Sequence, residues 1–201
     1  MFGPGYARHL MSRYQRRGLD KTATRIVSYL ASRGLEGASV LEVGGGVGAL
    51  QLELLKRGAR RATNLELVDA YESAADQLAD AAGVRDRVTR RRLDVATTPH
   101  LVDPHDIVIL HRVVCCYPDY ERLLTAAADR ARRLLVFSHP PRNVVTRTLS
   151  TLQHAGCRVT GRSFRTYTHP PAAMVAVAEG RGLRTGYRHR GRVWQVVALE
   201  R

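Results

Sequence analysis

Apolar and polar positions alternate along the chain in a way that predicts a regular series of strands and helices. Short, nearly continuous apolar runs indicate buried strands, whereas segments with apolar residues three or four positions apart indicate helices that bury one face. Strands are expected at 39–43, 62–67, 87–95, 106–110 and 134–138, and helices at 20–34, 49–57, 69–82 and 122–133.

The pattern in the last third of the chain predicts helices followed by an antiparallel pair of strands. An amphipathic helix is expected at 142–154 and another from Pro171 to Gly180. Strands at 185–189 and 193–199, joined by a turn at Arg190-Gly191, then predict an antiparallel hairpin. Residues 1–18 form an N-terminal extension, either a lid over a ligand or a frayed basic terminus, and residues 19–201 form one domain.

A glycine cluster follows the first predicted strand directly. Glycine at 44, 46 and 48 suits a backbone that turns sharply and lets a ligand approach closely. The helix after the loop points its free N–H groups and positive dipole end at that ligand, which is therefore expected to be partly anionic. Gly44, Gly46 and Ala49 formally satisfy the dinucleotide fingerprint G-x-G-x-x-G/A. Glu42, however, would repel a pyrophosphate and suits a cationic amine.

The pattern Glu42-x-Gly44-x-Gly46-x-Gly48 resembles motif I of the class I S-adenosylmethionine-dependent methyltransferases. The resemblance covers roughly residues 19–199. It implies a Rossmann-like, doubly wound α/β sheet of seven strands, mostly parallel, with a C-terminal antiparallel hairpin, which counts against a nicotinamide dehydrogenase. It also implies S-adenosyl-L-methionine as cofactor, bound by Glu42, Gly44, Gly45, Gly46, Gly48, Glu66, Leu67, Asp94, Val95 and His111.

Two acidic residues at expected strand ends carry the resemblance further. Glu66 lies 22 positions after Gly44, the spacing at which a carboxylate reaches both hydroxyls of a ribose. In the family, the residue matching Asp94 often accepts a hydrogen bond from the adenine amine. The structural alternatives are a solvent-facing glutamate and a turn aspartate before Ala96.

Candidate residues for the chemistry follow the later strands. Ligands of open α/β sheets bind beyond the carboxyl ends of the strands where the strand order reverses, which places residues 111–120 beside the transferred methyl group. His111 and His139 are the candidate catalytic bases, because histidine titrates near neutrality. Tyr117, His139 and His169 are the candidate substrate contacts. A hydrogen-bonded structural role is the alternative for each histidine. Direct in-line transfer requires neither a metal nor a covalent nucleophile.

The segments 111–120 and 137–142 look like those of short bacterial methyltransferases of unassigned substrate, a group distantly similar to the magnesium-protoporphyrin and ubiquinone-type enzymes. We therefore expect a transferase acting on a small molecule whose identity the sequence leaves open. Some family members methylate thiol-bound arsenic. Cys115 and Cys116 are nevertheless expected to pack as small apolar residues, because no other thiolate cluster accompanies them.

Charge and composition narrow the function further. The formal charge is +14, and all basic residues except Lys21 and Lys56 are arginine, a bias typical of genome composition. A basic surface supplies only the non-specific part of nucleic-acid binding, so an RNA methyltransferase is an alternative, as is a non-catalytic cofactor-binding protein of the same fold. Three cysteines match neither a disulfide framework nor a metal motif. No apolar run approaches the roughly 20 residues of a membrane span, and a cytoplasmic protein is expected.

Overall fold

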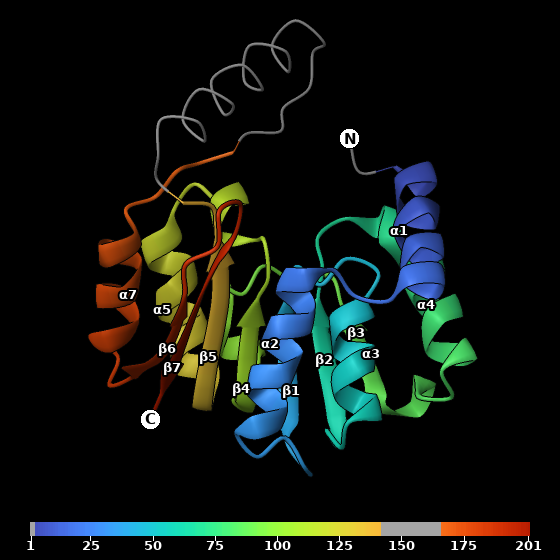
Figure 1. Ribbon diagram of the computed structural model, residues 1–201, viewed down its shortest axis with the longest axis horizontal. Coiled ribbons are helices and arrows are strands. Elements are labelled where there is room, and N and C mark those ends of the chain that lie inside the picture. Colours follow the sequence, from blue (N-terminus) through green and yellow to red (C-terminus); the bar gives the residue numbers. More distant parts are fainter. Residues whose placement is uncertain (1–2, 142–165) are drawn as a thin grey trace, which may run out of the picture.

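The computed structural model describes residues 3–141 and 166–201 (Figure 1). Within them, strands and α-helices alternate from β1 to β3. The helices are α1 (Pro4–Arg17), α2 (Lys21–Ser32), α3 (Ala49–Lys56), α4 (Glu72–Ala81), α5 (Tyr120–Arg130) and α7 (Pro171–Glu179). The strands are β1 (Ser39–Val43), β2 (Arg61–Leu65), β3 (Val88–Arg91), β4 (His105–Leu110), β5 (Ala131–His139), β6 (Arg184–His189) and β7 (Gln195–Glu200). Short 3-10 turns lie at η1 (Asp69–Tyr71), η2 (Arg85–Arg87), η3 (Pro99–Leu101) and η4 (Val114–Cys116).

The strands form one seven-stranded sheet in the order β3-β2-β1-β4-β5-β7-β6. The first five strands in this order run parallel, and β7 is antiparallel to both β5 and β6. The expected doubly wound sheet with a C-terminal antiparallel hairpin is thus confirmed. The strand order reverses between β1 and β4, which is where open α/β sheets bind ligands.

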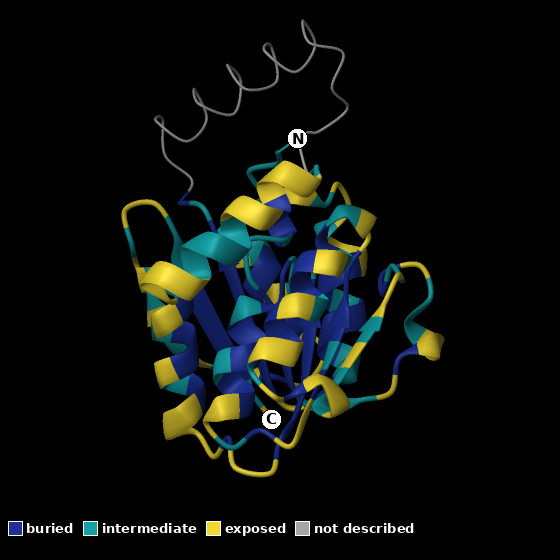
Figure 2. Cartoon of the chain, turned by 90° about the vertical axis from the view of Figure 1, so that its right-hand side faces the viewer, coloured by how far each residue is buried: buried dark blue, intermediate teal, exposed yellow. Residues whose placement is uncertain are grey.

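Two separate cores cover the faces of this sheet. Along β4, Ile107 and Ile109 pack with α2, α3 and α4, whereas Val108 and Leu110 pack with α5 and α7. This alternation follows from the two-residue period of a strand and explains why β4 is apolar without interruption. Figure 2 shows the buried strands in dark blue, enclosed by helices with exposed outer surfaces.

The N-terminal extension is a helix, and it packs on the first core. Ala7 is buried, and Leu10, Met11 and Tyr14 contact the same core from α1. Helix α1 lies beside α4 and η1 (Figure 1). Within residues 3–141 and 166–201, no helix combines the length and apolar character that a bilayer crossing requires.

Several predicted boundaries are wrong. Strand β2 ends at Leu65, so Glu66 lies in the following loop. The edge strand β3 covers only Val88–Arg91 and pairs with β2. Helix α5 ends at Arg130, and residues 131–133 begin β5 instead. Pairing of β5 with β4 overrides the helical pattern of these residues. The predicted helix at 142–154 and Cys157 lie outside the described residues.

Candidate functional site

A cavity of about 480 Å³ lies at the carboxyl ends of β1, β2 and β4. Its walls are residues 42–47, the loop 65–68, residues 93–95, residues 111–113 and 116–117, and part of α1. All of the cofactor residues expected from the sequence line it except Gly48. The structure therefore brings together residues from four loops at the switch point of the sheet.

The glycine loop is shaped by left-handed backbone and by close neighbours. Gly44, Gly46 and Gly48 have φ angles of +65°, +55° and +77°, which side-chain-bearing residues rarely adopt. A Cβ atom on Gly44 would lie 2.6 Å from Cγ2 of Val113. A Cβ atom on Gly45 would lie 2.3 Å from Nδ2 of Asn64. The loop is therefore pressed against the segment after β4 on one side and against polar side chains beneath it on the other.

Glu42 lies beneath this loop, with 3% of its surface exposed. Its Oε2 atom has no hydrogen-bond partner among the described residues. Burial raises the pKa of Glu42 to about 8 despite the nearby positive charge of Arg90. Both polar side-chain atoms of Asn64 beside it are also buried without a described partner. Such a cluster of unsatisfied groups is typical of a site that a polar ligand or water completes.

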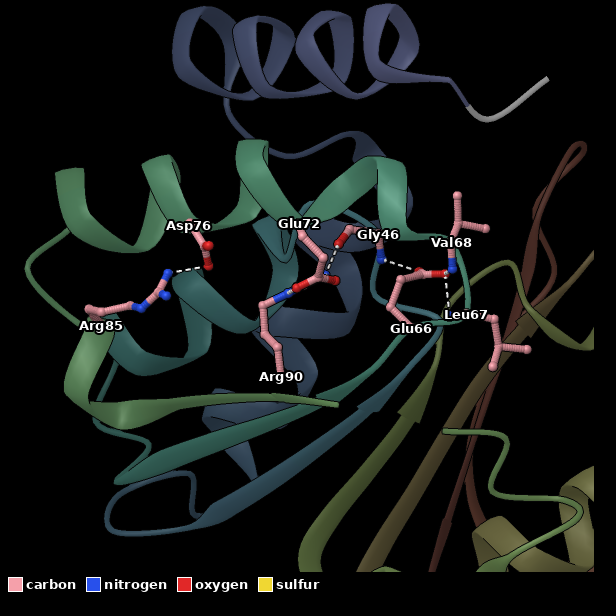
Figure 3. A network of polar contacts seen from close by, with 8 residues as sticks. All are labelled: Gly46, Glu66, Leu67, Val68, Glu72, Asp76, Arg85 and Arg90. Atoms are coloured by element: carbon pink, nitrogen blue, oxygen red, sulfur yellow. Dashed lines mark hydrogen bonds and ion pairs between the residues drawn. The ribbon is translucent and has the colours of Figure 1, made fainter. Parts of the chain in front are cut away.

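Glu66 connects the glycine loop to the loop after β2. Its Oε2 atom accepts from the backbone N–H of Gly46 at 2.9 Å, and its Oε1 atom accepts from the N–H groups of Leu67 and Val68 at 2.8 and 2.9 Å (Figure 3). A carboxylate has about four acceptor positions, so three bonds leave capacity for a ligand hydroxyl. Glu66 thus holds the loop and still faces the cavity.

Arg90 holds the same loop from the other side, and the sequence analysis missed it. Its guanidinium donates to the carbonyl oxygen of Gly46 at 3.0 Å and forms a bidentate pair with Glu72 at 2.8 and 2.9 Å (Figure 3). Only 8% of the Arg90 side chain is exposed. Gly46 is therefore held at both its N–H and its C=O. Arginine is too abundant in this chain for its position in β3 to have signalled this role.

Asp94 forms the turn that was the structural alternative for it, and it also lines the cavity. Its Oδ1 atom accepts from the N–H of Ala96 at 2.9 Å, which forms the turn, and its Oδ2 atom accepts from the hydroxyl of Tyr117 at 2.9 Å. Burial and this hydrogen bond raise the pKa of Tyr117 to about 12. Asp94 and Tyr117 both line the cavity, so the structure places Tyr117 beside the predicted nucleobase contact.

His111 also lines the cavity, and its two ring nitrogens differ in environment. Nδ1 lies 2.9 Å from Oγ of Ser138, whereas Nε2 is buried without a partner among the described residues. Burial, with a smaller contribution from Arg112, lowers the pKa of His111 to about 4. The imidazole is therefore neutral at neutral pH.

A charged group that the sequence analysis missed completes this wall. Asp20 caps α2 as predicted, accepting from the N–H groups of Thr22 and Ala23. Its Oδ2 atom also faces two guanidiniums, 2.9 Å from Arg112 and 3.6 Å from Arg13. Arg112 has a φ of +62°, the one positive value among the described non-glycine residues. Sequence gives no signal for such a backbone conformation.

His139 and His169 do not line the cavity. His139 is 2% exposed, bonds the carbonyl oxygen of Pro140 through Nδ1 at 2.9 Å, and has its pKa lowered by burial. Nε2 of His169 lies 2.9 Å from the carbonyl oxygen of Tyr117, and its ring is 4.6 Å from that of Tyr120. Both histidines thus have structural partners here.

The two neighbouring cysteines are reduced and differ in exposure. Cys115 is buried, and Cys116 is exposed and lines the cavity, with 3.7 Å between their sulfur atoms. No group of three or more histidine, cysteine or acidic side chains suited to a metal ion occurs among the residues that the structure describes.

Comparison with known proteins identifies the fold. No protein-family model and no curated protein sequence matches the chain. Among solved structures, magnesium protoporphyrin IX methyltransferase from Synechocystis with bound S-adenosylhomocysteine aligns with a TM-score of 0.74 and 22% identity, over 90% of this chain and 82% of that one.

Two further structures extend this likeness. An O-methyltransferase family 2 protein from Planctomyces limnophilus, in complex with apigenin, has a TM-score of 0.73 and 18% identity, and human N-acetylserotonin methyltransferase, in complex with S-adenosylmethionine, has 0.68 and 14%. Each covers 98% of this chain, which spans 61% and 55% of their respective lengths. The fold of this chain is thus that of the class I S-adenosylmethionine-dependent methyltransferases.

Proposed function

We propose that this protein transfers a methyl group from S-adenosylmethionine to a small-molecule acceptor by direct in-line displacement. The observation that carries the proposal is Glu66, which hydrogen-bonds the glycine loop through Gly46 and faces the cavity at the switch point of a methyltransferase fold. Fold alone does not decide activity, so the fit of the site to the cofactor is decisive.

The residues that line the cavity suit the parts of the cofactor. Glu66 retains acceptor capacity for the ribose hydroxyls, and Asp94, with Leu67 and Val95, suits the nucleobase. The unsatisfied carboxyl of Glu42 suits the cationic amine. An amine nearby would favour ionised Glu42 and relieve the cost of burying that carboxyl group. When bound, S-adenosylmethionine supplies a methyl group already activated by its sulfonium.

The protein's own contribution is to hold two molecules in line and exclude water. Helix α1 supplies Tyr6, Leu10 and Arg13 to the cavity wall, and we propose that residues 1–18 act as a lid on the acceptor side. A helix over the cofactor cavity favours a small-molecule acceptor over an RNA chain.

Ligand-induced stabilisation tests the cofactor assignment directly. S-adenosylhomocysteine at 100 times its dissociation constant is expected to stabilise the protein by about 2.7 kcal/mol, and NAD is expected to have no effect. Asp69→Asn changes an exposed ion pair with Arg92 outside the cavity. This control variant is expected to be stabilised by S-adenosylhomocysteine as much as the unmodified protein. Absence of stabilisation by S-adenosylhomocysteine would contradict the proposal.

Methyl transfer needs a separate measurement, because binding without turnover would indicate a non-catalytic protein. Incubation with methyl-labelled S-adenosylmethionine and a small-molecule extract is expected to yield a labelled product by mass spectrometry. Transfer of label to RNA instead would favour the RNA methyltransferase alternative.

A further inference from the structure

The hydroxyl group of Ser138 contacts both the ring of His111 and the backbone of Arg112. Ser138 is fully buried in β5, and its Oγ atom has two neighbours in the part of the chain that the structure describes. The backbone N–H of Arg112 donates to it at 2.9 Å, and Nδ1 of His111 lies at 2.9 Å. A serine hydroxyl has one hydrogen and two acceptor positions.

Only one tautomer of His111 satisfies all of these groups. The N–H of Arg112 uses an acceptor position of Ser138, so the hydroxyl hydrogen has Nδ1 of His111 as its acceptor. Nδ1 must then be unprotonated, and the ring proton lies on Nε2. The opposite tautomer would direct two donors at one oxygen and leave a buried hydroxyl hydrogen without an acceptor, which is unfavourable.

We infer that Ser138 holds His111 as the Nε2–H tautomer, so that His111 donates a hydrogen bond to an anionic oxygen bound in the cavity. This reverses the direction of proton sharing considered in the sequence analysis, where His111 was a candidate base. The Nε2 atom is buried and has no hydrogen-bond partner among the described residues, and His111 lines the cavity. Ser138 is a positioning residue in this arrangement.

The charges beside His111 also favour an anionic oxygen. Arg13 and Arg112 both face the single carboxylate of Asp20, and all three residues line the cavity next to His111. Two cations against one anion leave a net positive charge, which favours an anion in this part of the cavity. A carboxylate matches the combination of a neutral N–H donor and nearby guanidiniums.

Such a carboxylate has two possible sources, and both follow from the proposed function. One is the amino-acid end of the cofactor, and the other is the acceptor. A carboxylate acceptor needs no base, because its oxygen is already deprotonated. That oxygen would bond to the methyl carbon as the carbon–sulfur bond breaks, the electron pair would pass to sulfur, and a methyl ester and a neutral thioether would result.

Nuclear magnetic resonance of the full chain, labelled with ¹⁵N in its histidines, tests the tautomer without any ligand. Long-range ¹H–¹⁵N correlations at pH 7 distinguish a protonated ring nitrogen from an unprotonated one, and His111→Gln identifies the His111 signals. We expect a protonated Nε2 and an unprotonated Nδ1. The reverse pattern would overturn the inference, whether or not the protein binds a cofactor.

Two serine variants separate positioning from general packing. Ser138→Ala is expected to shift His111 toward a mixture of tautomers. Ser39→Ala, which removes another buried hydroxyl that bonds Asp106, is expected to leave the His111 signals unchanged. An unchanged tautomer in folded Ser138→Ala would contradict the role of Ser138. If that variant does not fold, the wild-type spectrum still decides the tautomer.

Three probes then identify the source of the anionic oxygen. If the cofactor supplies it, S-adenosylhomocysteine will move the Nε2–H signal downfield, and 5′-methylthioadenosine, which lacks the amino-acid end, will not. If the acceptor supplies it, benzoate added with 5′-methylthioadenosine will move the signal. No shift with any probe would overturn the donor role. Failure of S-adenosylhomocysteine to stabilise the protein would instead count against the proposed function.

Discussion

The two halves of the cavity are built differently. In the half formed by the loops after β1 and β2, backbone groups make most of the contacts, and Gly46 is bonded at both its N–H and its C=O. In the half formed by Arg13, Asp20, His111 and Arg112, side chains from three segments meet one another, and Arg112 adopts a left-handed backbone. Contacts to backbone groups depend less on residue type, whereas the second half depends on the identity of these four side chains.

The largest effect on stability is expected from a substitution where the two halves of the cavity touch. Gly44→Ala would place a Cβ atom against Val113 in a left-handed backbone, and we expect it to lower the free energy of unfolding by about 4 kcal/mol. The matched control is Gly46→Ala, which has a similar φ but no neighbour within 4 Å and should cost about 1 kcal/mol. Equal losses in urea unfolding would show that the contact with Val113 is unimportant.

A smaller effect on stability, and of opposite sign, is expected from a substitution of Glu42 beneath the glycine loop. The pKa of Glu42 is raised by folding, so the contribution of this carboxyl group to the free energy of unfolding is complete below pH 4.5. This contribution is lost as the pH rises through about 8. Glu42→Gln removes this penalty, so the free protein should gain about 3 kcal/mol of unfolding free energy at pH 8 and little at pH 4. The same variant should bind S-adenosylhomocysteine more weakly. A pH-independent gain would contradict the burial argument.

In the other half of the cavity, the contribution of His111 to stability should depend on pH in the opposite direction. The pKa of His111 is lowered from 6.5 to about 4, so its contribution to stability is complete above pH 6.5 and is lost as the pH falls toward 4. The difference in unfolding free energy between wild type and His111→Gln should therefore change by about 2 kcal/mol over this range. His100→Gln, at an exposed histidine in η3, serves as control and should show no such change.

The smallest effect concerns ligand affinity. Glu66→Gln replaces one acceptor oxygen with an NH₂ group, which cannot accept from the backbone or from a ribose hydroxyl. We expect about tenfold weaker binding of S-adenosylhomocysteine by calorimetry, equivalent to about 1.4 kcal/mol. The ion pair of Glu72 with Arg90 lies one step further from the cavity, and Glu72→Gln should weaken binding less. A larger loss of affinity in Glu72→Gln would indicate that Arg90, and not Glu66, has the main role in holding the glycine loop for binding.

Local sequence determined most of the fold and the first half of the cavity. The apolar run of β4, the cap at Asp20 and the glycine loop depend on short-range periodicity and backbone torsions, which residue type controls directly. The spacing of Glu66 from the loop reflects one helix and one strand, and Asp94 was predicted from its place at the end of the next expected strand. The structure places both in the cavity wall, and Asp94 also forms the turn that was its alternative.

Tertiary structure decided the rest, because it depends on contacts between distant segments. Residues 131–133 lie in β5 because neighbouring strands pair with them, against their local helical pattern. His139 was placed away from the cavity, while His111 was placed against Ser138. No spacing in the sequence predicts that a hydroxyl in β5 sets the tautomer of a histidine after β4, since the pairing of these strands brings the two groups together.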